Sequence, residues 1–371
     1  MSAQNRVIVL GATGTVGLKA CDILRRHSSS LVPAGFSAHS RKEALLLISQ
    51  GWPECPTFLT KDPAQRDALL DFLKHGEYEI CLNAIVGAAG LPFSEAVLKN
   101  GRTLALANKE SLVMAGRALM QLAAQNGGRI IPVDSEHSAI HQCLAASPGE
   151  GFRTLYLTAS GGALRDTPLD QFDAVTPAQA LAHPNWDMGP RITIDSATMV
   201  NKAFEIVEAA HLFSADASQI KVLIHRQSVI HSMVEFHDGS LLAQMGRPDM
   251  AFPVHYALHW PHRVADPVLQ GFDPILFSNL SLESPDSERF PALELAFEVV
   301  REGGASGAIL NAADEVLVEA FLRGEVRFTD IVPILAEALS ANPGFTADTI
   351  QDALAADTWA REFAQSICTR T

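Results

Sequence analysis

Short apolar runs alternate with longer stretches of helical periodicity over the N-terminal third of the chain. The apolar runs are 7–10, 31–36, 80–86 and 103–107, and the helical stretches between them include 16–26 and 92–99. Apolar runs of this length, each followed by an amphipathic stretch, are typical of β-α-β units. The pattern therefore predicts an α/β domain with a doubly wound parallel sheet over residues 1–133.

The pattern changes after residue 133, where strand-like runs and a helical run follow one another without regular alternation. Strand-like runs are 154–158, 191–194, 221–224 and 232–237, and a helix is expected from about 197 to 213. This mixed order predicts a central α+β domain over residues 134–260. The Pro-, Asp- and Ser-rich residues 261–289 suit a linker, and residues 290–371 predict a small helical domain.

Composition narrows the classes of partner. The chain has 371 residues, 47% of them hydrophobic, which is enough for more than one core. A formal net charge of −14 argues against a nucleic-acid or anionic-membrane surface, because such surfaces need excess Lys and Arg. The amino end lacks an apolar signal core, no apolar run approaches the ~20 residues of a membrane helix, and the five cysteines are scattered. We expect a cytoplasmic protein with small-molecule ligands.

A glycine loop follows the first predicted strand. Residues 11–17 have the sequence GATGTVG and open a helix, so backbone N–H groups there can approach a pyrophosphate. A glycine turn without a ligand is the alternative. The second strand ends near Ser40 and Arg41, where the acidic residue that binds a free ribose 2′-hydroxyl is missing. This favours NADP over NAD in a Rossmann-like domain, although a solvent-facing basic loop is equally compatible.

Two carboxylates follow the apolar run 129–133. Asp134 and Glu136 lie two residues apart in PVDSEHSA, and residues so spaced at the end of a strand project to one side. Such a pair can hold a hard divalent cation, whereas an isolated D-x-E is more often a solvated acidic turn. Histidines nearby suggest zinc only weakly, because the H-E-x-x-H arrangement is absent.

Polar residues also follow other predicted strands. Lys109 in ALANKES is either a ligand of a phosphate or hydroxyl or a surface lysine beside Glu110. Ser160 in ASGG can present donors to an anion, and a simple glycine turn is the alternative. The loop 183–189, HPNWDMG, carries apolar side chains that suit either a lid or a loop docked on the core.

The run IDSATMVNKAFE contains the densest group of polar candidates. Asp195 or Ser196 is expected to cap a helix, on which Asn201 and Glu205 share a face. Lys202 and Glu205 would otherwise form an ordinary i,i+3 surface pair. The apolar residues around them predict a buried helix, in which a carboxylate needs a partner or a metal. Glu205 would thus join Asp134 and Glu136 in an oxygen-rich site suited to Mg²⁺ or Mn²⁺.

Taken together, these motifs resemble one family, 1-deoxy-D-xylulose 5-phosphate reductoisomerase. The resemblance runs from residue 7 to at least 319, through GATGTVG, ALANKESLV, PVDSEHSA, ASGG, HPNWDMG, ITIDSATMVNKAFEIVEA, QSVIHSMVEFHDGSLLAQMGRPDM and NAADEV. It implies an NADPH- and metal-dependent homodimer that rearranges and reduces the sugar phosphate 1-deoxy-D-xylulose 5-phosphate to 2-C-methyl-D-erythritol 4-phosphate, in non-mevalonate isoprenoid synthesis.

The resemblance also implies roles for individual residues. The metal ligands would be Asp134, Glu136 and Glu205, and the catalytic residues Lys109, Glu136 and His183. Substrate would be bound by Lys109, Ser135, Glu136, Ser160, His183, Trp186, Ser196, Asn201, Lys202 and Glu205. Cofactor would be bound by Thr13, Gly14, Thr15, Val16, Ser40, Arg41, Asn108, Glu110, Met188 and Gly189. Trp186 and Met188 would belong to the closing lid.

The chain departs from the usual family pattern at a few positions. Arg226, Asp314 and Ser138 stand where Pro, Asn and Asn are usual, and none of them is a proposed ligand. Arg41 replaces a common asparagine beside the adenosine phosphate, so some tolerance of NAD is compatible with the pattern.

Two functions from other classes compete with the reductoisomerase. A semialdehyde dehydrogenase would need a nucleophilic cysteine, and Cys143 lies in a helical run without a catalytic-cysteine loop. A silent dinucleotide-binding sensor would be free to lose the carboxylates, all of which are present.

Overall fold

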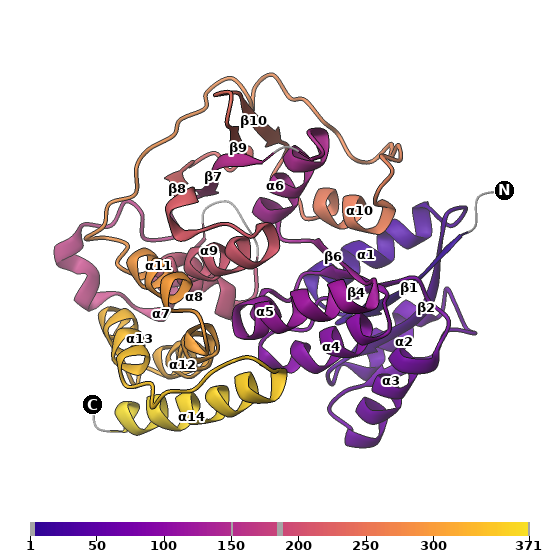
Figure 1. Cartoon of the computed structure of the whole chain (residues 1–371), viewed down its shortest axis with the longest axis horizontal. Coiled ribbons are helices and arrows are strands. Elements are labelled where there is room, and N and C mark those ends of the chain that lie inside the picture. Colours follow the sequence, from indigo (N-terminus) through magenta and orange to yellow (C-terminus); the bar gives the residue numbers. More distant parts are fainter. Residues whose placement is uncertain (1–3, 150, 184–187, 370–371) are drawn as a thin grey trace. The chain divides into compact units, whose positions relative to one another are not determined.

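The computed structural model describes residues 4–149, 151–183 and 188–369. Contacts within the chain divide it into two compact units, each built from three segments. The first comprises Met1–Ser111, Leu119–His141 and Asp249–Gln270. The second comprises Leu112–Ala118, Gln142–Pro248 and Gly271–Thr371. Figure 1 colours the chain by sequence, so the interleaving of segments can be followed there.

A six-stranded parallel sheet forms the centre of the first unit (Figure 1). Its strands are β1 (Asn5–Leu10), β2 (Leu31–Ala38), β3 (Thr57–Leu59), β4 (Ile80–Asn83), β5 (Thr103–Leu106) and β6 (Arg129–Pro132). They lie in the order β3-β2-β1-β4-β5-β6, the order of doubly wound dinucleotide-binding sheets. The chain reverses direction across the sheet between β1 and β4, and ligands of such folds bind at the carboxyl ends beside this point.

Helices cover both faces of this sheet. They are α1 (Thr15–Arg26), α2 (Lys42–Ser49), α3 (Pro63–His75), α4 (Leu91–Lys99) and α10 (Ala251–His259), while α5 (Lys109–Asn126) and α6 (Ser135–Ala146) cross between the units. Right-handed crossovers put α1 and α2 on one face, and α3 and α4 on the other. A core of buried side chains from β1, β2, α1, α2 and α10 fills the first face. The predicted doubly wound domain is confirmed.

The second unit contains a four-stranded mixed sheet and most of the helices. Its strands are β7 (Phe152–Ala159), β8 (Ile220–Ile224), β9 (Ile230–Phe236) and β10 (Leu241–Met245), in the order β10-β9-β7-β8. The strands β7 and β8 are parallel, whereas β9 is antiparallel to both of its neighbours. Its helices are α7 (Pro177–Ala180), α8 (Pro190–Thr198), α9 (Val200–Phe213), α11 (Ala292–Glu302), α12 (Ser306–Leu322), α13 (Ile331–Ser340) and α14 (Ile350–Cys368). The mixed central part and the helical end are confirmed.

The expected strand at 191–194 is wrong, because these residues lie in α8. The β-branched run favours a strand locally, but Pro190 at the first helical turn fixes a helical φ. The hydroxyl of Thr193 donates to the Gly189 carbonyl at 2.8 Å, and α8 packs against α9 and α12. Tertiary packing therefore overrides the strand propensity.

The helix expected from 197 to 213 is two helices. It breaks at Met199, which has φ 64° between α8 and α9. Asp195 and Ser196 lie inside α8, so neither caps the following helix as we predicted. The predicted burial of that helix is confirmed, since Lys202, Glu205 and Glu208 are all buried.

The two carboxylates of PVDSEHSA do not share a strand. Strand β6 ends at Pro132, Asp134 lies in the connecting loop, and Glu136 is in the first turn of α6. The two-residue spacing therefore does not project them by strand alternation, and a helix start gives them their directions instead.

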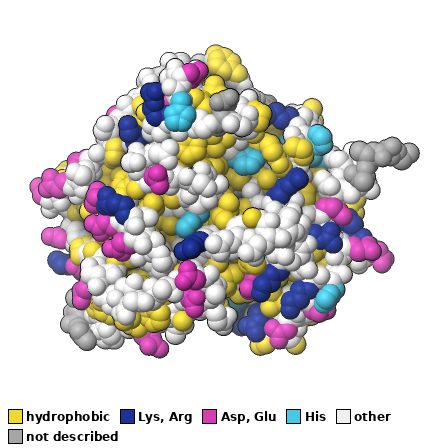
Figure 2. Space-filling model, viewed as in Figure 1, with side chains coloured by type: hydrophobic (Ala, Val, Ile, Leu, Met, Phe, Trp, Pro, Cys, Tyr) yellow, Lys and Arg dark blue, Asp and Glu magenta, His cyan; other side chains and the backbone are white. Residues whose placement is uncertain are grey.

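Residues 261–289 contain no helix or strand apart from an isolated bridge between Ile224 and Glu283. Among the residues that are described, no helix is long and apolar enough to cross a membrane. Figure 2 shows one face of the molecule, on which basic and acidic side chains are interspersed among apolar ones.

Candidate active site

The loop between β1 and α1 is built for close approach of a ligand to the backbone. Gly11 has φ +74°, and a Cβ there would lie 2.5 Å from the carbonyl oxygen of Ala84. A Cβ on Gly17 would lie 2.2 Å from the carbonyl oxygen of Gly11. Gly14 precedes α1 without a side-chain cap, so the first N–H groups of the helix face outward with no capping side chain. Uncapped N–H groups at a helix start can bind an anion.

The predicted cofactor residues around this loop lie together in the first unit. Thr13 is half-buried, whereas Gly14 and Thr15 are exposed. Ser40 and Arg41 are exposed just beyond the end of β2. Arg41 donates through Nη1 to the carbonyl of Thr13 at 3.4 Å, which brings a guanidinium beside the glycine loop. A positive charge there suits a phosphate group.

Asn108 and Glu110 form a buried hydrogen-bonded group at the carboxyl end of β5. Asn108 Nδ2 donates to Glu110 Oε2 at 2.7 Å and to the Gly87 carbonyl at 3.0 Å. Glu110 Oε1 accepts from the Gly87 amide at 2.9 Å. These two side chains therefore shape the loop after β4, beside the point at which the sheet reverses direction.

Lys109 and Asp134 form an ion pair at the edge of the same sheet. Their Nζ and Oδ2 atoms are 3.0 Å apart, and His137 Nδ1 lies 3.4 Å from the same oxygen. Burial alone would raise the pKa of Asp134, but the Lys109 ammonium and His137 hold it well below its usual range. The carboxylate is therefore ionised at neutral pH and available as a metal ligand.

Ser135 and Glu136 follow directly at the start of α6. The Ser135 hydroxyl donates to Glu136 Oε2, and the Ser135 amide donates to Asp134 Oδ1 at 3.1 Å. Asp134, Ser135 and Glu136 are all half-buried. The first unit thus presents two carboxylates, a hydroxyl and an ammonium within one short stretch of structure.

In the second unit, the ASGG turn after β7 packs against α8. Gly162 has φ +72°, and a Cβ there would lie 2.3 Å from the carbonyl oxygen of Ser196. Gly162 thus lets the turn that holds Ser160 lie against the segment that holds Ser196, and both serines are half-buried. Arg165 Nη1 donates to the Ser160 carbonyl at 2.9 Å, which adds a positive charge to this turn.

His183 is joined to the same turn. Its Nε2 atom lies 3.1 Å from Ser160 Oγ, and Oγ also accepts from the Gly162 amide at 3.2 Å. Burial and, to a smaller extent, the nearby charge of Arg165 lower the pKa of His183 to about 4. The imidazole is therefore neutral at pH 7, and can accept or donate one proton there.

Lys202 and Glu205 form a second, more deeply buried ion pair on α9. Lys202 Nζ donates to Glu205 Oε2 and, at 2.6 Å, to the carbonyl of Thr158 in β7. Asn201 Nδ2 donates to Glu205 Oε1 at 2.6 Å. The predicted i,i+3 pair is thus present, but it is an interior pair and not a surface one.

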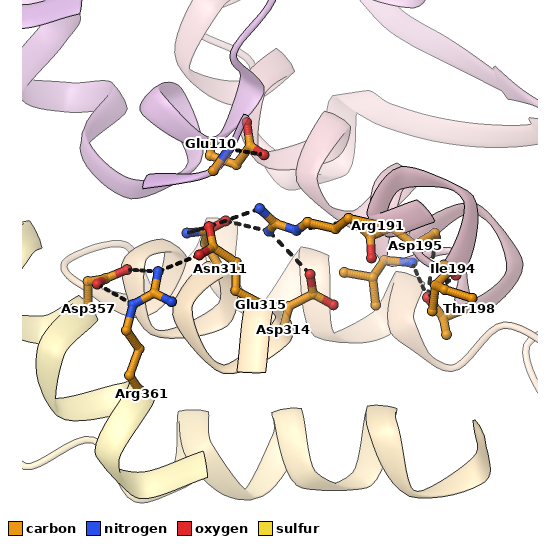
Figure 3. Close-up of polar contacts among 12 residues, drawn as sticks. Glu110, Arg191, Ile194, Asp195, Thr198, Asn311, Asp314, Glu315, Asp357 and Arg361 are labelled. Atoms are coloured by element: carbon orange, nitrogen blue, oxygen red, sulfur yellow. Dashed lines mark hydrogen bonds and ion pairs between the residues drawn. The ribbon is translucent and has the colours of Figure 1, made fainter. Parts of the chain in front are cut away.

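Arg191 anchors the start of α8 directly after the loop 183–189. It donates to Glu315 at 2.9 Å and Asn311 at 2.9 Å, and pairs with Asp314 at 3.3 Å. Figure 3 shows these side chains of α12 directed toward Arg191, with Arg361 joining Glu315 to Asp357. Asp314, the departure from the family's usual asparagine, lies fully buried in this network and pairs with a cation.

Met188 and Gly189 lie at the described edge of the loop, and Gly189 precedes the first residue of α8. Trp186, predicted to belong to the lid, lies outside the described residues. Sequence reasoning missed His137, Arg165 and Arg191. The sequence could have indicated His137, because it follows Glu136 directly. It could not have indicated Arg165 or Arg191, because their contacts join distant segments.

The metal candidates fall in both units: Asp134 and Glu136 in the first, Glu205 in the second. Cys143, the only cysteine considered as a nucleophile, is buried within α6. A reactive thiol is usually partly exposed, so a buried one is a poor candidate for a catalytic nucleophile.

Models of a single protein family match three segments of the chain. The description "1-deoxy-D-xylulose 5-phosphate reductoisomerase" applies to residues 56–116. Its C-terminal domain matches residues 130–213, and a further DXP reductoisomerase C-terminal domain matches residues 245–363.

Relatives and solved structures of the same family match this chain over nearly all of its length. The 1-deoxy-D-xylulose 5-phosphate reductoisomerase of Pseudomonas aeruginosa is 42% identical, over 100% of this chain and 99% of its own. That of Xanthomonas oryzae is 44% identical, over 98% and 97%. A crystal structure of the reductoisomerase with NADPH, fosmidomycin and magnesium superposes with a TM-score of 0.91 at 35% identity, over 98% of both chains. The Zymomonas mobilis enzyme with NADPH has a TM-score of 0.89 at 36% identity, over 99% of both. The chain therefore belongs to the 1-deoxy-D-xylulose 5-phosphate reductoisomerase family.

Proposed function

We propose that this chain is an NADPH- and Mg²⁺-dependent enzyme that rearranges and reduces 1-deoxy-D-xylulose 5-phosphate to 2-C-methyl-D-erythritol 4-phosphate. The observation that carries the proposal is its likeness, over 98% of its length, to a reductoisomerase crystallised with NADPH, fosmidomycin and magnesium. The glycine loop, the ionised Asp134 and the turn that holds Ser160 offer the chemistry that those ligands require.

The β1–α1 loop fits the pyrophosphate of NADPH. Gly11 and Gly17 leave no room for a side chain, and the start of α1 offers backbone N–H groups to an anion. We assign Thr13, Gly14, Thr15 and Val16 to the pyrophosphate, Ser40 and Arg41 to the 2′-phosphate, and Asn108, Glu110, Met188 and Gly189 to the nicotinamide half. The guanidinium of Arg41 beside the loop supports the preference for the phosphorylated cofactor.

The carboxylate donors fit a hard divalent cation. We assign Asp134, Glu136 and Glu205 as its ligands, because three carboxylates without cysteine or histidine suit Mg²⁺ or Mn²⁺. When bound, the cation polarises the substrate ketone and acidifies the neighbouring hydroxyl. Lys109, held beside Asp134, is placed to orient a substrate hydroxyl and to assist its proton transfer.

The second unit supplies the residues that we assign to the rest of the substrate. Ser160, Ser196, Asn201 and Lys202 would bind the phosphate and neighbouring oxygens, with Arg165 adding a positive charge to the Ser160 turn. His183 is neutral and lies against Ser160, so it can bind a substrate hydroxyl. Ser135 and Trp186 complete the assigned substrate residues, and the loop 183–189 would exclude water when it closes.

We further propose that the chain works as a homodimer in the cytoplasm. Strand β10 is an edge strand with exposed apolar side chains, including Leu241 (52% exposed), and the linker exposes Phe272 (77%) and Ile275 (84%). A second copy of the chain would cover such an edge. The five cysteines are free, which suits a reducing compartment.

The proposal divides the chain into four parts. Residues 1–133 bind the cofactor, residues 134–260 carry out catalysis, residues 261–289 form a linker, and residues 290–371 form a helical part. Mn²⁺ is proposed as an alternative to Mg²⁺, because both accept oxygen ligands.

An NADPH oxidation assay tests the activity. After chelation, the protein is supplied with 1-deoxy-D-xylulose 5-phosphate, NADPH and either no metal, Mg²⁺ or Mn²⁺, and absorbance is followed with product identification. We expect oxidation only with metal, and one branched polyol phosphate formed per NADPH. A folded protein that binds NADPH but shows no oxidation with either metal would contradict the proposal.

A further inference from the structure

Three buried histidines meet in the first unit, on the sheet face covered by α1 and α10. His27 follows the last residue of α1, and His255 and His259 lie one turn apart on α10. Their exposed fractions are 7%, 8% and 4%. Histidine is seldom buried in groups, because each ring carries two nitrogens that need partners.

The three rings are in mutual contact. The centroid separations are 4.9 Å for His27 and His255, 4.7 Å for His27 and His259, and 4.2 Å for His255 and His259. One nitrogen from each ring lies within 4.8 Å of those from the other two. With Zn–N bonds of about 2.0–2.1 Å, ligand nitrogens of a tetrahedral site are roughly 3.3 Å apart. Small side-chain rotations would therefore close the group around one ion.

Two of the rings have a buried nitrogen that is not used in a hydrogen bond. His259 Nδ1 donates to the His255 carbonyl at 2.9 Å, which leaves Nε2 as the unprotonated nitrogen. Within the described part of the chain, Nε2 of His255 and Nε2 of His259 are buried without a hydrogen-bond partner. Buried nitrogens of this kind require an internal water or a ligand.

A buried carboxylate, that of Asp266, lies beside the three histidines. Asp266 Oδ2 lies 3.1 Å from His27 Nε2, and the Asp266 side chain is 0% exposed. A carboxylate that accepts one ring N–H orients metal-binding histidines and leaves the other nitrogen for the metal. Arg26 donates to the same oxygen at 2.7 Å, so its positive charge is balanced by Asp266.

We propose that His27, His255 and His259 form a binding site for one borderline divalent transition-metal ion, Zn²⁺ above all, which fastens α10 to the end of α1. Imidazole nitrogens select Zn²⁺ over Mg²⁺, whereas the carboxylates assigned to catalysis prefer the harder ion. Burial lowers the pKa of His255 to about 4 and also lowers that of His259, so both rings are in the neutral form that ligates metals. The site does not depend on the reductoisomerase activity.

Zinc titration of the full-length protein tests the site. After chelation, the protein is kept in excess Mg²⁺ to fill oxygen-rich sites and is titrated with Zn²⁺ against a chromogenic chelator. We expect one equivalent to bind, and the affinity to fall at least about 100-fold in the double variant His255→Gln/His259→Gln. His75→Gln is the matched control, because His75 is exposed on α3 and should leave the affinity unchanged.

Cobalt spectroscopy on the wild-type protein is a second test of the histidine site. Co²⁺ added to the chelated wild-type protein in excess Mg²⁺ should give the strong visible absorption of a four-coordinate ion, and added Zn²⁺ should abolish it. A wild-type protein that binds Zn²⁺ no more tightly than the double variant, or a Co²⁺ spectrum equal to that of the hydrated ion, would overturn the proposal. In that case the rings enclose a water molecule only.

Discussion

Each unit of the molecule contains a lysine paired with a carboxylate, and the two pairs differ in construction. Lys109 and Asp134 come from a helix start and a loop 25 residues apart, and their side chains are 10% and 17% exposed. Lys202 and Glu205 lie three residues apart on α9 and are 4% and 1% exposed. The first pair is assembled by the sheet and borders solvent, whereas the second is local and enclosed.

The two pairs also differ in the number of partners that surround each charge. In the pair at the sheet edge, the Lys109 ammonium keeps Asp134 ionised, as a metal ligand requires. The pair on α9 is held by Thr158 and Asn201 as well, so each charge has several partners inside the protein. Removing one member of an enclosed pair should therefore cost more stability than removing one member of the accessible pair.

The largest expected effect concerns the accessible carboxylates. We expect Glu136→Gln to lower metal-dependent turnover by about 10³-fold or more, because the neutral amide cannot replace an anionic ligand. The fold and NADPH affinity should be unchanged, with the melting temperature within about 2 °C of wild type. Steady-state kinetics and thermal unfolding measure both. Glu54→Gln, an exposed residue, is the control, and near-normal turnover in Glu136→Gln would refute the metal assignment.

The second largest effect is expected on the free energy of unfolding, when the enclosed Lys202–Glu205 pair is broken. Lys202→Met leaves Glu205 buried without its ammonium partner, and we expect the free energy of unfolding to fall by about 3–5 kcal/mol. Urea unfolding followed by circular dichroism measures this change.

The double variant Lys202→Met/Glu205→Leu is the matched control for the enclosed pair. It removes both charges, so most of the lost stability should return, because apolar side chains of similar volume tolerate burial. If Lys202→Met costs less than about 1 kcal/mol, the pair is not enclosed in solution and the comparison fails.

A smaller loss of stability is expected in the accessible pair. Lys109→Met leaves Asp134 with His137 and with access to water, so we expect the free energy of unfolding to fall by only about 1–2 kcal/mol. The same urea measurement gives the value. A loss equal to that of Lys202→Met would show that both pairs are equally enclosed.

Much of this fold follows from local pattern. The alternation of apolar runs and amphipathic stretches predicted β1, β2, β4, β5 and the helical end, because each element is set by residues close in sequence. The buried character of α9 followed from Ala203 and Phe204 and their apolar neighbours for the same reason. The Lys202–Glu205 pair was visible in the sequence as an i,i+3 spacing.

What the sequence did not predict depends on contacts between distant segments or on strained backbone. Met199 adopts φ 64° although methionine carries no signal for it, so the break between α8 and α9 was missed. The run at 191–194 has strand propensity but is held in a helix by packing. The Lys109–Asp134 contact required the actual order of strands β5 and β6, which the spacing of two motifs cannot supply.

The smallest expected effect is on the pH dependence of the free energy of unfolding. Between pH 6.5 and 4, this dependence comes from a buried histidine and not from the Lys109–Asp134 pair. Burial lowers the pKa of His141 to about 4, while an unfolded histidine has a pKa of about 6.5. As the pH falls from 6.5 toward 4, the unfolded chain therefore binds a proton that the folded chain refuses, and the free energy of unfolding decreases. Asp134 has a lowered pKa, so its contribution is complete above its unfolded value near 3.8 and is not lost in this range.

His141→Asn tests this assignment through the slope of stability against pH. Its ring hydrogen-bonds the Tyr256 hydroxyl at 2.8 Å, so the variant will be somewhat less stable at every pH. Between pH 6 and 5, however, its slope should be shallower than that of wild type by up to about 1.4 kcal/mol per pH unit, because one proton fewer separates the two states. An unchanged slope would mean that the acid sensitivity comes from other buried histidines, such as His183, His255 and His259, whose pKa values burial also lowers.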